Sequence, residues 1–438
     1  MIRQVRVELR RSNAPVVAVL LLAIGVLGTA SMYSFWQGQW LRLGYVHASD
    51  MFLLVPLALA GGAVLGRRDR RTRADDLMNS TGRPRWQRAL PAMTALGIAV
   101  GSAHLLVVAA SAAVVATDGA YLGVRGLAGP LVDVLVLVGA AWVGVAVGRL
   151  WSSPLLPPLL AAAALVAQEG TAMLGGTGDS RLTNASLMIS WPPDTPWETL
   201  SDRLLLSRLA LGAGLVLAGL LLAASLAGGV AGLLLIGVPG PAGIWQLDPG
   251  ARRYVCAEGT PQVCVTAVNA HLLPQITPEA RRGLRALAKL PDAPTRAVEL
   301  RLDTIGSNDS EQWHRPKPVP GTVQFLLEVD PDTGRAADVA ERVALGGGTT
   351  WYGCGRSGDD IAPAIAAAWL LDAETVRLWD SWTGYRHTDT QQPEIRDGVR
   401  QLRTLPEPEQ LRRVTALRDA AARCEPDLMP ALTGRAAP

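Results

Sequence analysis

The sequence predicts an α-helical membrane domain of six or seven spans, followed by a small α+β soluble domain. Hydrophobic residues make up 49% of the 438 residues, and they are concentrated in the first half instead of being spread periodically. Long apolar runs in that half alternate with arginine-rich segments. From about Trp245 the composition becomes mixed and includes all four cysteines. The predicted domains are therefore residues 1–240 and 245–438.

The membrane domain contains six regions that reach or approach the roughly twenty apolar residues of a span. These regions are residues 14–31, 51–65, 89–116, 127–147, 154–174 and 204–238. The second region is short. The sixth is too long for one ordinary span, so it is either one long helix or a hairpin that turns near residues 225–229. Ahead of the first region, residues 2–11 place Ile2, Val5 and Leu9 on one helical face among arginines, which favours an interfacial helix.

Arginine placement predicts the orientation of the spans. Four arginines precede the first span, and eight lie between the second and third: Arg67, Arg68, Arg70, Arg71, Arg73, Arg83, Arg85 and Arg88. Segments 32–50 and 117–126 contain only Arg42 and Arg125. Since positively charged loops remain in the cytoplasm, we expect a cytoplasmic N-terminus and a cytoplasmic segment 66–88 in a cell membrane.

The number of spans decides where the soluble domain lies. One crossing by residues 204–238 would put it in the cytoplasm, and two crossings would put it outside. All four cysteines fall in this domain: Cys256, Cys264, Cys354 and Cys424. An even number of cysteines in one domain favours two disulfides and an oxidising compartment. The seven-span, extracytoplasmic arrangement is therefore the preferred one.

The soluble domain has mixed element signals. "YVCAEGTPQVCV" predicts a hairpin with Cys256 opposite Cys264. A helix is predicted over 277–290, strands over 297–302 and 322–329, and helices over 361–379 and 406–424. The last helix brings Cys424 to a position where Cys354 can pair with it. These elements indicate a small α+β domain with its own core.

Catalytic and ligand-binding signatures are not recognisable in this chain. No G-x-x-x-x-G-K-[ST], H-E-x-x-H or G-x-S-x-G pattern occurs. "GGGTTWYGCGRSG" is glycine-rich but has no lysine, and the histidines are not at ligand spacing. The net charge of +3 gives no argument for nucleic acid. We expect a protein that is not an enzyme and that binds no metal and no cofactor directly.

Polar residues within the apolar regions suggest a route through the membrane. Asp133, Gln168 and Glu169 are the candidates, with His104 also at membrane depth. Ionisable groups in spans are costly and usually face protein or a water path. The alternative for Asp133 is a position at the membrane interface.

Two segments resemble the permease subunits of type-2 ABC exporters of the actinobacterial kind. They are "ELRRSNAPVV" and "RRDRRTRADDLMNSTGRPRWQRAL", and the resemblance covers about residues 1–238. In that family a short helix in the loop after the second span docks on a separate ATPase, which binds the ATP. The resemblance implies that the ATPase-docking site is formed by Asp75, Asp76, Leu77, Met78, Ser80, Thr81, Arg83 and Pro84. The cysteine-bearing C-terminal domain is a departure, because family members commonly end after six spans.

The loop chemistry suits such a dock. Asp75 and Asp76 favour a helix N-terminus, Leu77 and Met78 offer an apolar knob, and the arginines suit anionic lipids of the inner leaflet. We therefore expect an exporter permease subunit that forms a homodimer or heterodimer of permeases and contacts membrane lipids and an ATPase, but no nucleic acid. The alternative is a membrane-anchored extracytoplasmic binding or sensor protein without transport activity.

Overall fold

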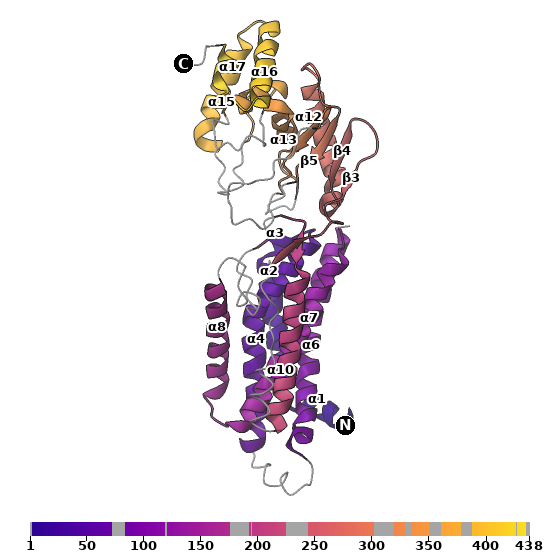
Figure 1. Cartoon of the computed structure of the whole chain (residues 1–438), viewed down its shortest axis with the longest axis vertical. Helices are drawn as coiled ribbons and strands as arrows, with labels where there is room; N and C mark the ends of the chain where they lie inside the picture. The colour runs from indigo at the N-terminus through magenta and orange to yellow at the C-terminus, as the bar shows by residue number, and fades with distance from the viewer. Residues whose placement is uncertain are drawn as a thin grey trace. The chain divides into compact units, whose positions relative to one another are not determined.

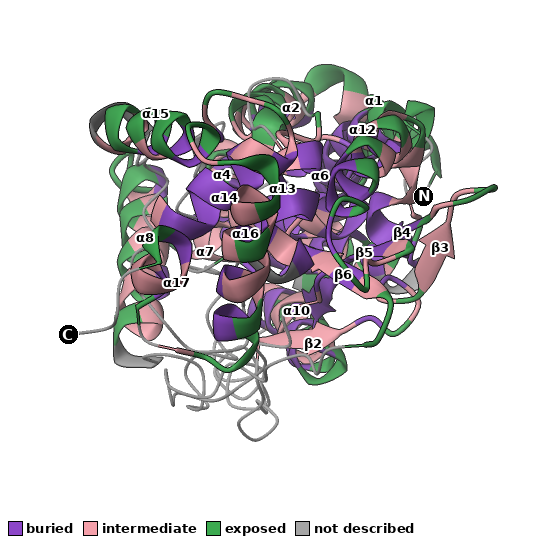
Figure 2. Cartoon of the chain, turned by 90° about the horizontal axis from the view of Figure 1, so that it is seen from above, coloured by how far each residue is buried: buried purple, intermediate pink, exposed green. Residues whose placement is uncertain are grey.

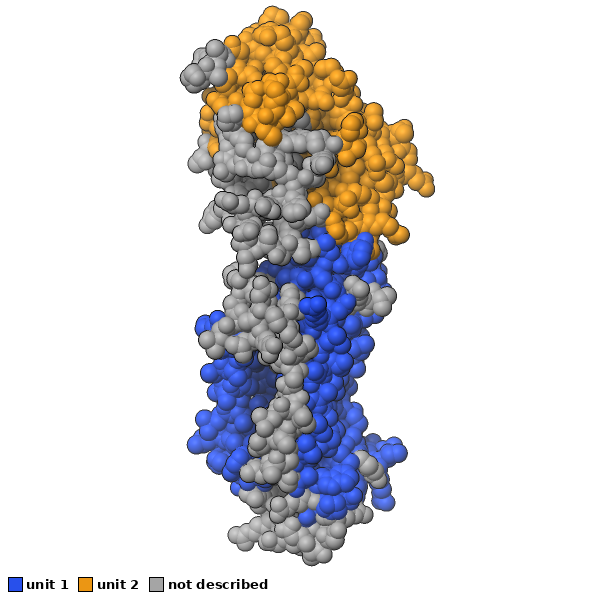
Figure 3. Space-filling view, in the orientation of Figure 1, with its two compact units in different colours: residues 1–249 blue, residues 250–438 orange. Residues whose placement is uncertain are grey.

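The computed structural model describes residues 2–71, 84–118, 121–175, 192–193, 195–224, 244–301, 319–329, 335–349, 361–377, 388–425 and 427–434. The chain divides into two compact units, Met1–Pro249 and Gly250–Pro438, coloured blue and orange in Figure 3. Each unit is built around its own hydrophobic core.

The first unit is a helical bundle. Its helices are α1 (Ile2–Arg11), α2 (Ala14–Ser31), α3 (Tyr33–Trp36), α4 (Trp40–Arg71), α6 (Arg85–Thr117), α7 (Val124–Leu150), α8 (Leu156–Gly175) and α10 (Asp202–Ala224) (Figure 1). Among the described residues, five helices are long and apolar enough to cross a membrane. They are Ala14–Ser31, Trp40–Arg68, Trp86–Thr117, Ala128–Leu150 and Asp202–Ala224. The N-terminal half is therefore a multi-pass membrane domain.

The second predicted span was too short. Residues 51–65 were expected, whereas α4 begins at Trp40 and ends at Arg71. The additional turns contain His47 and Asp50, which interrupt the apolar pattern of the sequence. Helix α4 tolerates these polar residues because His47 is buried against other helices and is not exposed to lipid.

The fifth and sixth predicted spans also differ from the structure. Helix α8 forms within the predicted range 154–174 to one residue, but it is not among the five helices that meet the criteria of a membrane span. Helix α10 accounts for the first part of region 204–238 and ends at Ala224. The predicted turn near 225–229 lies outside the described residues.

Glycines let α4 and α7 cross at very short range. A Cβ atom added at Gly62 would lie 2.2 Å from the carbonyl oxygen of Ala141, and one at Gly144 would lie 2.1 Å from that of Leu59. Only glycine, whose side chain is a hydrogen atom, lets the two helix backbones approach this closely at these positions. Small residues of this kind let helix backbones pack closely in membranes, where the hydrophobic effect gives little drive for association.

A two-stranded ribbon lies at one end of the bundle. Strand β1 (Glu198–Leu200) pairs antiparallel with β2 (Trp245–Leu247), and Leu200 faces Trp245. The Trp245 ring lies 5.8 Å from the Tyr45 ring near the start of α4. Aromatic residues collect at membrane–water boundaries because their rings are apolar and their tips are polar. The ribbon therefore lies at the end of the bundle where α4 begins.

The second unit is a small mixed sheet packed with helices. Strands β3 (Tyr254–Cys256), β4 (Gln262–Thr266), β5 (Arg296–Glu299) and β6 (Thr322–Phe325) occur in that order in the sheet. The pair β3–β4 is antiparallel, and β4–β5 and β5–β6 are parallel. The helical segments are η1 (Ala267–Leu272), α12 (Leu273–Leu287), α13 (Val339–Ala344), η2 (Leu345–Thr349), α14 (Ile361–Leu370), α15 (Thr388–Arg403), α16 (Glu407–Ala422) and α17 (Met429–Thr433).

Helix α14 forms the centre of this unit's core. It is buried along nearly its whole length (Figure 2), which explains its apolar, alanine-rich sequence without a polar face. It ends at Leu370, earlier than the predicted 379. Helix α12 begins at Leu273, one turn before the predicted start, because Ile276 is fully buried and belongs to the apolar stripe.

Candidate functional site

The candidate site is a polar cluster inside the helical bundle of the first unit. Its centre is the ion pair between Asp133 of α7 and Arg208 of α10. The Arg208 Nη1 atom lies 3.3 Å from the Asp133 Oδ1 atom, and the two side chains are 1% exposed or less. A single charge in an apolar bundle is costly, so each of these side chains requires the other. Asp133 is therefore buried in protein between α7 and α10.

Close helix packing brings these two side chains together. A Cβ atom added at Gly139 would lie 2.6 Å from the Cβ of Leu215, and one at Gly212 would lie 3.0 Å from the backbone nitrogen of Val136. Gly212 is one turn after Arg208. The α7 and α10 backbones therefore approach closely next to the pair, which shields it from lipid.

A second carboxylate lies near this pair. The Thr29 hydroxyl of α2 donates to Asp50 Oδ2 of α4 at 3.0 Å. The other oxygen, Oδ1, lies 2.3 Å from where a Cβ of Gly28 would be. The absence of a side chain at Gly28 thus makes the space that this carboxylate occupies. The Asp133 carboxylate repels Asp50, so the two acids are within electrostatic range of each other.

Two histidines extend the cluster from α4 and α6. His47 Nε2 forms a 3.0 Å hydrogen bond with the Ser111 hydroxyl, and the rings of His47 and His104 have centroids 6.0 Å apart. His104 is hydrogen-bonded to the backbone of Pro130, one turn before Asp133. Its Nε2 atom is buried and has no hydrogen-bond partner in the described part of the chain.

The other predicted route residues lie elsewhere. Gln168 of α8 is buried and donates to the backbone carbonyl of Phe52 in α4 at 3.2 Å. Glu169 is partly exposed on the same helix. The contacts of Gln168 are in the α4–α8 interface, whereas those of Asp133 are in the α7–α10 interface. Among the described residues, Gln168 and Asp133 therefore lie in different helix interfaces.

The residues predicted to form the ATPase-docking site fall almost entirely outside the described part of the chain. Asp75, Asp76, Leu77, Met78, Ser80, Thr81 and Arg83 lie outside the described residues, and Pro84 is the first described residue after them. The flanks are described: α4 ends at Arg71 and α6 begins at Arg85. The helix predicted over residues 2–11 forms as α1, and its Glu8 pairs with Arg68 at 3.2 Å. Helix α1 therefore lies at the end of the bundle where this segment starts.

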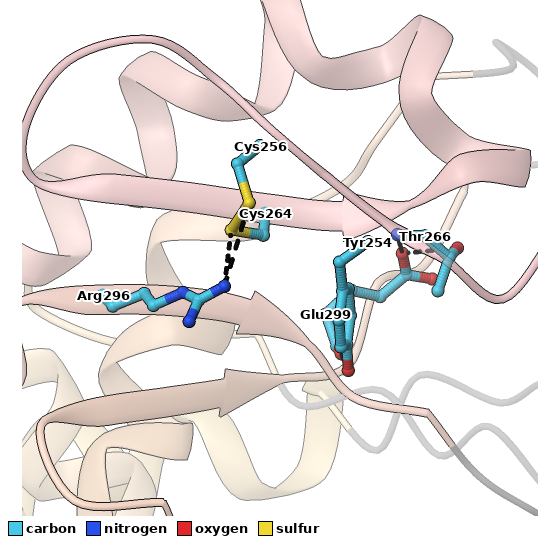
Figure 4. Close-up of a disulfide and its surroundings, with 6 residues drawn as sticks. All are labelled: Tyr254, Cys256, Cys264, Thr266, Arg296 and Glu299. Carbon is cyan, nitrogen blue, oxygen red and sulfur yellow. Dashed lines mark hydrogen bonds between the residues drawn. A yellow bond between two sulfur atoms is a disulfide. The ribbon is translucent and has the colours of Figure 1, made fainter.

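In the second unit the first predicted disulfide is confirmed. Cys256 and Cys264 face each other across β3 and β4 and are bonded (Figure 4). The Arg296 guanidinium lies 3.3 Å from Cys264 Sγ. Cys424 is also disulfide-bonded. Its expected partner, Cys354, lies outside the described residues.

The same unit contains a buried carboxylate, Glu299. It accepts hydrogen bonds from the Thr266 backbone N–H at 2.5 Å, the Thr266 hydroxyl at 2.8 Å and the Asn269 amide at 2.7 Å. Burial raises the pKa of Glu299, and these donors oppose that change. Because every donor comes from β4 and η1, the carboxylate ties these segments to β5. This arrangement fits a structural role.

Sequence reasoning missed three members of the bundle cluster: Asp50, His47 and Arg208. Arg208 lies one turn into an apolar run, and Asp133 is the lone acid of another run. Two opposite charges of this kind in separate spans are a signal for pairing. Asp50 and His47 were missed because the second span was expected to begin at residue 51.

Comparison with known proteins identifies no family for this chain. No protein-family model, no curated protein and no solved structure matches the chain.

Proposed function

We propose that the chain is the membrane-spanning permease subunit of an ABC-type exporter, coupled to a separate ATPase through segment 66–88. The observation that carries the proposal is the buried Asp133–Arg208 pair in a multi-pass bundle. A bundle that only anchors a soluble domain gains little from burying two charges, since an apolar pair of similar volume is often as stable. Polar groups inside a span bundle are typical of proteins that move solutes.

The described flanks of segment 66–88 support a docking role. Helices α4 and α6 lead into and out of the segment, and the Glu8–Arg68 pair connects α1 to the same end. The arginines of this end give it the charge of a cytoplasmic surface. An ATPase that contacts Leu77 and Met78 would thus be connected to two long helices of the bundle. Dimerisation with a second permease completes the proposed complex.

The docking proposal is tested by co-purification. The full chain is expressed in its native host, extracted in mild detergent and isolated by affinity, and the captured proteins are identified by mass spectrometry. Wild type should capture a protein with a P-loop. Leu77→Asp/Met78→Asp should lose it, whereas the matched control Leu77→Ile/Met78→Leu should keep it. Equal capture by all three chains would contradict docking through this apolar pair.

Strand pairing supports two crossings by region 204–238. Strand β1 directly precedes α10, and β2 follows residues 225–243. Helix α10 is 23 residues long, about 34 Å. The chain therefore leaves α10 at one end of the bundle and is next described at the other end, beside β1. With α8 counted as a crossing helix, this return favours seven spans. Together with the cytoplasmic N-terminus expected from the arginines, seven spans favour an extracytoplasmic second unit.

Labelling of cysteines tests this topology. Intact cells are treated with a reductant and then with a membrane-impermeant maleimide. Cys424 should be labelled in intact cells if the second unit is outside. Labelling that appears only after lysis would contradict the seven-span arrangement.

The alternative function, an anchored extracytoplasmic binding or sensor protein, is favoured by the size of the second unit's own core. It predicts that no P-loop protein is captured in the co-purification. It also predicts that neutral replacement of both Asp133 and Arg208 leaves ligand responses unchanged.

A further inference from the structure

We propose that the Cys256–Cys264 disulfide is a reversible redox site, at which a dithiol reductant opens the bond and Arg296 stabilises the Cys264 thiolate that is released. The proposal concerns the second unit alone and does not depend on export or on an ATPase. It rests on the position of Arg296, on the different exposure of the two cysteines and on the chemistry of thiol–disulfide exchange.

The sheet register places Arg296 on the same face as the disulfide. Strands β4 and β5 are parallel, and Gln262 of β4 lies opposite Arg296 of β5. Successive side chains of a strand point to opposite faces, so Gln262 and Cys264 share a face, and Arg296 shares it with them. The alternate residues of these strands belong to the core of the unit: Val263, Val265 and Ala297. Arg296 and the disulfide therefore lie on the face turned away from that core.

The guanidinium of Arg296 points at the sulfur atoms (Figure 4). Its Nη2 atom lies 3.3 Å from Cys264 Sγ and 3.8 Å from Cys256 Sγ. In the described part of the chain, the buried Nε atom of Arg296 has no hydrogen-bond partner and the guanidinium makes no ion pair with a carboxylate. A cation removed from water is stabilised by a negative partner. The disulfide offers it neutral sulfur, whereas reduction creates a thiolate next to it.

The exposure of the two cysteines determines which sulfur atom a reductant attacks. Cys264 is fully buried, whereas Cys256 is partly exposed and lies on β3, an edge strand of the sheet. An incoming thiolate therefore attacks Cys256, and Cys264 is the sulfur that leaves. A stabilised thiolate is a better leaving group, and a neighbouring guanidinium provides that stabilisation.

The exchange takes place in two steps. One thiolate of the dithiol attacks Cys256 Sγ: a mixed disulfide forms, the Cys256–Cys264 bond breaks, and its electron pair stays on Cys264 Sγ. The second thiolate of the reductant then attacks the reductant's own sulfur in the mixed disulfide and displaces Cys256. The reductant becomes a disulfide and the chain gains two electrons. Of the two protons of the dithiol, one passes through water to Cys256 and the other remains in solution, because the Cys264 thiolate stays paired with Arg296.

Reduction acts on the first strand of the second unit. Strand β3 ends at Cys256 and follows the division between the two units after Pro249. With the disulfide opened, β3 keeps its main-chain pairing with β4 but loses the covalent link to it. The site therefore controls how firmly the chain is fixed where it enters this unit.

Reduction kinetics of the full chain in lipid nanodiscs test the role of Arg296. Dithiothreitol is added, samples are quenched with acid at intervals, and the free cysteines are alkylated and identified by peptide mass spectrometry. Arg296→Gln should slow reduction of the Cys256–Cys264 bond about tenfold, since a hydrogen bond to a charged group is worth about that factor. Arg296→Lys, which keeps the positive charge, should stay near the wild-type rate. The disulfide of Cys424 is the reference within each sample and should be reduced equally fast in all three chains.

The sign of the effect separates this role from a packing role. If Arg296 only packed against the hairpin, Arg296→Gln would loosen β3 and speed reduction, so an unchanged or faster rate would overturn the proposal. A second measurement uses the wild-type chain and does not depend on the folding of a variant. After brief treatment with glutathione, the mixed disulfide should be found on Cys256, and an adduct on Cys264 would also overturn the proposal. Neither measurement involves an ATPase, so this proposal and the exporter proposal fail separately.

Discussion

Replacement of Arg208 by glutamine should strongly destabilise the bundle. Arg208 lies 3.3 Å from Asp133 and both side chains are almost fully buried. At an effective dielectric constant of about 20, two unit charges at this distance attract by about 5 kcal/mol. Removal of one partner from a buried pair typically costs about 3–5 kcal/mol, because the other charge remains buried and unpaired. We expect a loss within that range for Arg208→Gln.

A double-mutant cycle separates this effect from simple loss of packing. Asp133→Asn combined with Arg208→Gln leaves two neutral amides that can hydrogen-bond to each other. The double variant should therefore be more stable than the Arg208→Gln variant, with a coupling of about 2 kcal/mol or more between the positions. The assay is unfolding of the full chain in detergent, followed by tryptophan fluorescence. Losses that simply add would refute the inference that the two charges depend on each other.

The remaining predictions concern packing, the disulfide and pH. Gly144→Ala should destabilise the bundle by about 1–3 kcal/mol, because its Cβ would meet the α4 backbone. Gly170→Ala, where the added Cβ meets nothing within 4 Å, is the matched control for thermal unfolding. Cys256→Ser/Cys264→Ser opens a loop with a sequence separation of 8 and should cost about 2.5 kcal/mol in the chain-entropy account. The rate of cleavage by the protease thermolysin should rise in the second unit only, and an unchanged rate would contradict this role of the disulfide. Burial raises the pKa of Glu328 from 4.5 to about 7, although Arg342 opposes this rise. A raised folded-state pKa gives a stabilising contribution that is fully present below about pH 4.5 and is lost as the pH rises through about 7. Glu328→Gln should remove this part of the pH dependence, measured as the unfolding midpoint of the full chain, and a persistent dependence would assign it to other acids.

The parts of the fold that follow local patterns were predictable from the sequence. The first span and helix α16 agree closely with the predicted ranges, since uniform apolar composition and a proline-initiated helix are local signals. The β3–β4 hairpin and its disulfide also follow from a short turn between two apolar ends. These elements depend little on the rest of the chain.

The candidate site depends on contacts between distant residues. Asp133 was selected by its type and depth, but its partner Arg208 is 75 residues away and becomes identifiable only when α7 packs on α10. Likewise, Asp50 appeared to lie outside a span because polarity lowers local hydropathy. Tertiary packing reverses that assignment, since a buried partner such as Thr29 makes a polar residue acceptable within a helical bundle.

ATP hydrolysis by the isolated complex is the most direct test of the proposed function. The chain is purified from its native membrane in mild detergent and transferred to nanodiscs, and phosphate release is measured. Wild type and Leu77→Ile/Met78→Leu should hydrolyse ATP through the captured ATPase, and Leu77→Asp/Met78→Asp should not. A wild-type preparation that captures no P-loop protein and releases no phosphate would contradict the assignment as an exporter permease.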